Sequence, residues 1–431
     1  MPKTNLLVSV ALLVLSTFSA GCSGGLSDRT RGMRTALEAG DSQGAIAHLN
    51  RELHVKTALD LPRRLRGDDA LLVLDRATIQ QSVAQLAGSK RDYEAADKAI
   101  DMLDLSHGTA DDIARWTFSD SAGRYAAPFH EKLLVNVLNM VNYLESSDLS
   151  GARIEARRLT VTARHAQNFR ADDPSSEQSR VLGFGSVLAG FVYEKSGEPD
   201  EANRFYADAR RADVTPVLSE DESDTGELLV VVGWGRVPHR VAHRVPIGHA
   251  LTRAAPFLEP DEHAAASRLA AQGLVTWVAF PTLANATELT HAPVIMVDGR
   301  SVPLDTTLDV TAEVREQWRR IEGAVMAAAT TRAVTRVLVG KAVEGIANTS
   351  DKKEVRAVGF LVSLFAQAAL SAADTPDTRS WETLPAKLGV ARLRLQPGRH
   401  HVVLEARGHR RDGTVAITPG GWGAVSLLAL R

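Results

Sequence analysis

The stretch that decides the fold reads GFVYEKSG at residues 190–197 and EANRFYADA at residues 201–209. The pattern reads as helix, turn, helix. Gly197 stands at the turn, where a left-handed residue is often needed. The small side chains of Ala202 and Ala209 let the second helix approach the first closely. The stretch therefore predicts two antiparallel helices joined by a short turn.

Two tyrosines accompany the small residues of this hairpin. Tyr193 and Tyr206 can fill the groove between the helices, and we take them as candidate partner-binding residues. The unit has the pattern of a tetratricopeptide-like hairpin. Weaker versions occur near residues 37–49, 86–99 and 144–156, at uneven intervals that exceed the standard repeat.

The repeated pattern predicts a degenerate tetratricopeptide-like α-solenoid with insertions, a helical domain over residues 31–215. Stacked hairpins bury a continuous core and leave a concave face that can bind peptides or other proteins. A compact helical bundle without a ligand groove is the alternative interpretation.

The composition is that of a folded protein. The 431 residues are 44% hydrophobic and 24% charged, enough to bury a sizeable core in two or three domains. The formal net charge of -2 creates no global field for nucleic acid, so we expect no nucleic-acid partner. The chain has one cysteine, which excludes an internal disulfide.

That cysteine follows a segment typical of a bacterial lipoprotein signal peptide. Residues 1–21 combine a short positive start, an apolar core at residues 6–15 and small residues before Cys22. The segment resembles a lipobox, with Ser19 where such motifs usually carry leucine. We expect lipidation at Cys22, an anchor and linker at residues 22–30, and a periplasm-facing location on the outer membrane.

The second half changes from helix-forming to strand-forming composition after an acidic linker at residues 216–226. Short apolar runs separated by turn residues predict an antiparallel sheet, and a long apolar stripe predicts a helix over Thr311 to Ala347. The predicted fold class is therefore α+β: a helical solenoid followed by a smaller α+β domain at residues 227–431.

A separate segment, residues 355–373, is almost wholly apolar but only marginally long enough to span a bilayer. We interpret it as a buried core helix. A surface that docks on a partner or a membrane, and a membrane insertion, are the alternatives.

Motifs for catalysis and metal binding are absent from the sequence. It contains no phosphate-binding loop, no nucleophile elbow and no HExxH. His130 and Glu131 begin such a pair, but Leu134 replaces the second histidine, so we interpret them as a surface or capping feature. His239, His243 and His249 lie close in sequence, but extended chain would hold them apart. We assign no catalytic residue, metal or cofactor.

Residues 377–385 read DTRSWETLP, and this segment is similar to a D-x-R-x-W-x-x-L-P segment in an uncharacterised family of bacterial envelope lipoproteins. The resemblance implies a tetratricopeptide-like helical N-terminal region and no established activity. Arg379 and Trp381 could stack at the start of the sheet, and we take both as candidate partner-binding residues. A structural lock that joins helix to sheet is the other interpretation.

These features together predict a non-catalytic scaffold or accessory factor in cell-wall or surface assembly, which binds envelope proteins through its helical domain. Two alternatives remain. An envelope hydrolase acting on glycan or peptide would need a cleft lined by two close carboxylates. An accessory to lipid or polysaccharide export would expose residues 355–373.

Overall fold

The computed structural model describes residues 25–104, 125, 127–169, 179–216, 225–273, 275, 277–285, 289, 291–348 and 376–431. Cys22, the apolar segment at residues 355–373 and most of the acidic linker lie outside the described residues. Among the helices of the described part, none is both long and apolar enough to cross a membrane.

The N-terminal part is helical, and each helix packs against its neighbours in sequence. Its helices are α2 (Leu26–Arg29), α3 (Arg31–Glu38), α4 (Ser42–Glu52), α5 (Asp69–Ser82), α6 (Leu86–Asp104), α8 (Phe129–Glu145), α9 (Leu149–Phe169), α10 (Arg180–Lys195) and α11 (Pro199–Arg211). The helical prediction is confirmed.

The α10–α11 hairpin shows why the sequence folds in this way. Gly197 adopts a positive φ of 75° at the turn, as the sequence predicts. A side chain at Gly190 would lie 2.3 Å from Cε1 of Tyr206, so glycine is required for the close approach of the two helices. Tyr193 stacks on Phe205 at a centroid distance of 5.3 Å. Both tyrosines therefore fill the hairpin interior.

The first sheet has the strand order β10–β1–β7–β6. Its strands are β1 (Gly226–Trp234), β6 (Thr306–Asp309), β7 (Lys387–Leu395) and β10 (Trp422–Ala429). β1 is antiparallel to β7 but parallel to β10, so the predicted antiparallel pairing holds in this sheet except for the β1–β10 pair. The chain enters both parallel strands from the same end, where the amide of Glu227 donates to the carbonyl of Gly421 at 2.9 Å.

The second sheet has the order β5–β4–β8–β9 and packs against the first. Its strands are β4 (Val294–Val297), β5 (Arg300–Val302), β8 (Gly398–Ala406) and β9 (His409–Ile417). Asp298 and Gly299, a residue pair that favours hairpin turns, connect β4 to β5 with φ values of 50° and 77°, as a type I′ turn requires. The sequence analysis did not predict β5 or β6, which are only a few residues long.

A separate lobe contains β2 (Arg240–Pro246), β3 (Trp277–Leu283), α12 (Ile247–Ala254), a short 3-10 turn at Ala255–Phe257, α13 (Pro260–Ala271) and α14 (Val310–Asn348). The long helix is where the sequence predicts it. β3 continues through Pro281. The two-stranded sheet tolerates this proline because it leaves strand edges unpaired.

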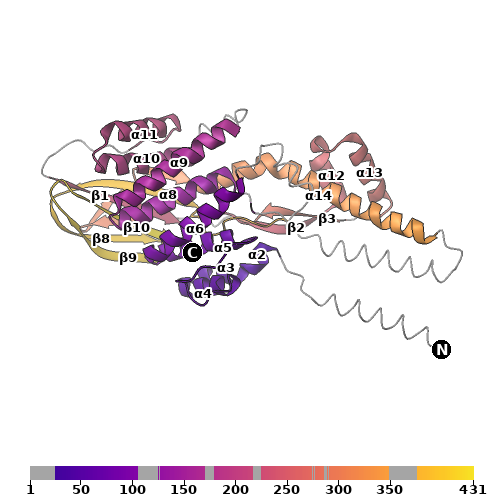
Figure 1. The fold of residues 1–431 in the computed structure, drawn as a ribbon, viewed down its shortest axis with the longest axis horizontal. Helices are drawn as coiled ribbons and strands as arrows, with labels where there is room; N and C mark the ends of the chain where they lie inside the picture. The colour runs from indigo at the N-terminus through magenta and orange to yellow at the C-terminus, as the bar shows by residue number, and fades with distance from the viewer. Residues whose placement is uncertain are drawn as a thin grey trace.

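The first sheet lies between the helices and the second sheet, with side chains of β1 alternating between two cores. Leu228 and Val230 face the second sheet, whereas Leu229 and Val231 join the helical core. Figure 1 shows α8 and α10 over this sheet, and both helices contact its strands. The hydrophobic core is therefore continuous from the helical region into the sheet.

Candidate functional site at residues 377–385

The segment at residues 377–385 packs against the helices instead of lying on the surface. The indole of Trp381 has 0% exposure, and its Nε1 donates to Oγ1 of Thr78 on α5 at 3.1 Å. The ring meets Tyr93 of α6 edge to face at a centroid distance of 5.9 Å. An aromatic pair of this geometry adds to the energy of burial.

Two buried carboxylates bind the backbone of the segment. The amide of Trp381 donates to Oε1 of Glu131 on α8 at 3.2 Å. The amide of Thr383 donates to Oδ1 of Asp75 on α5 at 2.9 Å. These bonds satisfy backbone donors that no strand partner reaches, so they hold the segment between helix and sheet.

Ion pairs also hold the segment in place. Nη1 of Arg34 lies 2.6 Å from Oε2 of Glu382, and both side chains are largely buried. Arg379 donates from Nε to Asp377 at 2.8 Å and lies 4.0 Å from Asp68 on the helical side. Both Arg379 and Trp381 are therefore buried in the protein interior.

Burial dominates the electrostatics of these carboxyls. Desolvation raises the pKa of Glu131. Desolvation also raises the pKa of Asp75, and the negative charge of the nearby Glu382 carboxylate raises it further. Burial also raises the pKa of Glu382, against the attraction of Arg34, to about 7. Oδ2 of Asp75 and Oε1 of Glu382 are buried without a hydrogen-bond partner in the described part of the chain. Protonation of these carboxyls relieves that cost.

The Glu382 carboxyl predicts a pH dependence of stability. Its pKa is raised from an ordinary 4.5 to about 7 in the folded chain. The folded state therefore binds more protons between these pH values, and the free energy of unfolding falls as pH rises through this window. Glu382→Gln should reduce the change in the free energy of unfolding across this pH window by up to roughly 3 kcal/mol. Urea unfolding at several pH values measures this change.

The matched control for this pH prediction is Glu52→Gln. Glu52 also pairs with an arginine, Arg29, but it is partly exposed. The control profile should follow that of the unmodified chain. A Glu382→Gln profile that keeps the full slope would contradict the assignment.

A small cleft with a cavity volume of about 30 Å³ lies beside the segment, where the segment meets the lobe. Its walls include Trp381, His130, Glu131 and Arg240, and the Arg240 guanidinium lies 5.4 Å from the centre of the Trp318 ring. His130 and Glu131 are buried, so their interpretation as a surface feature is wrong: the first turn of α8 faces the segment, not solvent.

This cleft does not provide the carboxylate pair that a glycan hydrolase requires. Its lining residues include one acid, Glu131, and both oxygens of that acid accept hydrogen bonds, from Tyr125 and from the Trp381 amide. Within the described ranges, no group of three or more His, Cys, Asp or Glu residues is placed to hold a metal ion.

Tyr193 and Tyr206, the other two predicted partner-binding residues, are also buried. The hydroxyl of Tyr206 donates to Oε2 of Glu194 at 2.8 Å, and Arg392 of β7 pairs with the same carboxylate. Burial would raise the pKa of Glu194, but the hydrogen bond and charge of Arg392 hold it at about 2. Tyr206 therefore helps to join the hairpin to the sheet, whereas Tyr193 packs within the helices.

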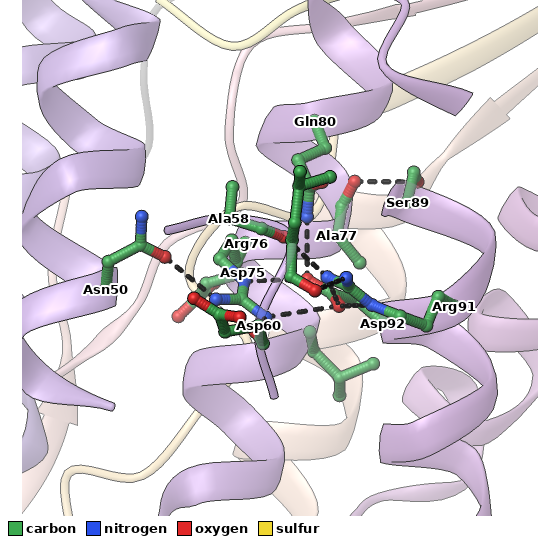
Figure 2. Close-up of polar contacts among 12 residues, drawn as sticks. Asn50, Ala58, Asp60, Asp75, Arg76, Ala77, Gln80, Ser89, Arg91 and Asp92 are labelled. Atoms are coloured by element: carbon green, nitrogen blue, oxygen red, sulfur yellow. Dashed lines mark hydrogen bonds and ion pairs between the residues drawn. The ribbon is translucent and has the colours of Figure 1, made fainter. Parts of the chain in front are cut away.

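A buried ion pair that the sequence analysis missed stabilises the helices around the segment (Figure 2). Arg76 of α5 donates from Nε to Oδ2 of Asp92 on α6 at 2.7 Å, with both side chains fully buried. Arg76 also donates to Oδ1 of Asn50 at 2.8 Å, and Gln80 donates to Asp92 at 2.6 Å. The network connects α4, α5 and α6 directly behind Asp75.

No known protein family, curated protein or solved structure matches this chain. The site is therefore interpreted from its geometry alone. Its carboxylates and cations are engaged with one another and with the backbone, an arrangement that holds parts of the chain together.

Proposed function

We propose that the protein is a lipid-anchored, non-catalytic scaffold of the bacterial envelope, with a tetratricopeptide-like helical region that recruits another envelope protein. The observation that best supports this proposal is the burial of residues 377–385, which joins the helices and the sheet into one continuous core. The anchor is proposed from the signal-like segment that ends at Cys22. A joined body with a membrane tether suits a protein that positions others.

The recruiting surface we propose is the outward face of α9. α8 and α10 contact the sheet, so their inner side is occupied by the chain itself. On α9, Ile154 is 52% exposed and Val161 is 66% exposed, and the exposed Arg157 and Arg164 lie at helical spacing beside them. Two apolar side chains flanked by arginines favour a partner surface that is apolar at its centre and acidic around it.

Capture of the partner tests this surface. Ile154→Asp combined with Val161→Asp should abolish the specific crosslinked partner of the lipidated protein in its native envelope, because the change places two acids where the partner is apolar or acidic. Leu59→Asp is the matched control, since Leu59 is an apolar residue that is 81% exposed elsewhere on the helical region. Crosslinking followed by mass spectrometry measures both.

The outcome that contradicts the surface is capture of the same partner by both variants. The anchor is tested separately, by the mass of the N-terminal peptide: it should carry acyl chains on Cys22 and lose them in Cys22→Ala.

A further inference from the structure

One face of the two-stranded sheet of the lobe packs into the lobe core, and the opposite face is exposed at the end that carries Pro246 and Trp277, whereas Pro281 farther along that face is buried. Val245, Val278 and Phe280 pack into the lobe core with α12, α13 and α14. The opposite face carries Trp277, which is 58% exposed and pairs in register with Pro246. We call the side chains of Ala242, Arg244, Pro246 and Trp277 the ribbon face.

An exposed tryptophan next to a cation is the main chemical feature of the ribbon face. Arg244 lies diagonally across from Trp277, opposite Ala279, and it is exposed without an ion-pair partner among the described residues. Tryptophan is enriched at membrane interfaces, where its ring lies among the headgroups. An arginine beside it can contact lipid phosphates.

The expected anchor enters the structure beside this sheet. α2 begins at Leu26 and contacts β2. The residues between Cys22 and Leu26 span at most about 14 Å when fully extended. Figure 1 shows α2 next to β2, with the lobe of α12, α13 and α14 at one end of the molecule and the sheet of β8 and β9 at the other. A lipid on Cys22 therefore holds β2 close to the bilayer.

We propose that the ribbon face is a second membrane contact, which rests on the leaflet that holds the lipid anchor. This inference depends on the anchor of the proposed function. Trp277 enters the headgroup region, Arg244 binds phosphate groups, and the two contacts together orient the body on the membrane.

Fluorescence quenching by brominated lipids tests the membrane contact. Cys22 is the only cysteine, so the mature chain can be coupled through it to a maleimide phospholipid in phosphatidylethanolamine and phosphatidylglycerol vesicles. The emission of Trp277 is the difference in fluorescence between the unmodified chain and the Trp277→Phe variant. This difference should lose most of its intensity when the lipid acyl chains are brominated. Arg244→Glu should reduce that quenching, because it repels the anionic headgroups.

A tryptophan at the far end of the molecule is the control. Val294→Trp in the Trp277→Phe background places an exposed indole on β4, in the sheet that includes β8 and β9, and it should stay unquenched. Unquenched Trp277 on the tethered chain, or equal quenching at position 294, would overturn the membrane contact alone. An N-terminal peptide from native membranes without acyl mass would instead overturn the anchor.

Discussion

Replacing Trp381 with alanine is expected to lower the free energy of unfolding by about 3–5 kcal/mol, the cost of emptying a large aromatic site in a packed core. The indole is fully buried against Tyr93, and its Nε1 bonds to Thr78 and Thr383. The loss falls at the contact between helices and sheet. We therefore expect the helical region to become separately sensitive to protease.

Chemical denaturation and limited proteolysis of the mature chain measure this effect. Trp277→Ala is the matched control, because it removes the same side chain from an exposed position and should change stability by no more than about 0.5 kcal/mol. Equal losses for the two variants, or a Trp381→Ala chain that resists protease like the unmodified one, would show that residues 377–385 do not join the two parts.

Asp92→Ala is expected to destabilise the protein by about 3–5 kcal/mol, because it leaves the Arg76 guanidinium buried without its counter-charge. Arg76 cannot lose its proton to escape the cost. Its remaining acceptors are Oδ1 of Asn50 and the carbonyl of Asp60, both neutral. The midpoint of urea unfolding measures the change.

A surface ion pair provides the comparison for Asp92. Asp28 pairs with Arg31 on an exposed part of the chain, and Asp28→Ala should cost about 0–1 kcal/mol. If Asp92→Ala is as mild as Asp28→Ala, the network of Figure 2 contributes nothing measurable.

Local patterns in the sequence predict most of the elements. The α10–α11 hairpin is readable because Gly197, Gly190 and the two tyrosines act within a few residues of one another. The long helix α14 and the Asp298–Gly299 turn are readable for the same reason. β5 and β6 escape prediction because strands this short have too few residues to show alternation.

The site at residues 377–385 is only partly readable. The sequence shows an arginine and a tryptophan close together in this segment, but the carboxylates that bind it, Asp75 and Glu131, are separated from it by hundreds of residues. A buried acid without a local partner is the one signal in the sequence: Asp75 lies inside the apolar run of α5, DALLVLDRATI. A buried carboxylate needs a hydrogen-bond or ion-pair partner, but the sequence does not show which residue that partner is.

By itself the sequence determined the main helices, the longer strands and their turn residues. These depend on contacts within a few residues, where backbone geometry and side-chain period act directly. Only the tertiary structure decided that β1 and β10 run parallel, that Trp381 lies among the helices, and that Arg76 faces Asp92. Those contacts join distant segments, and their free energy is gained only after the whole chain has closed around them.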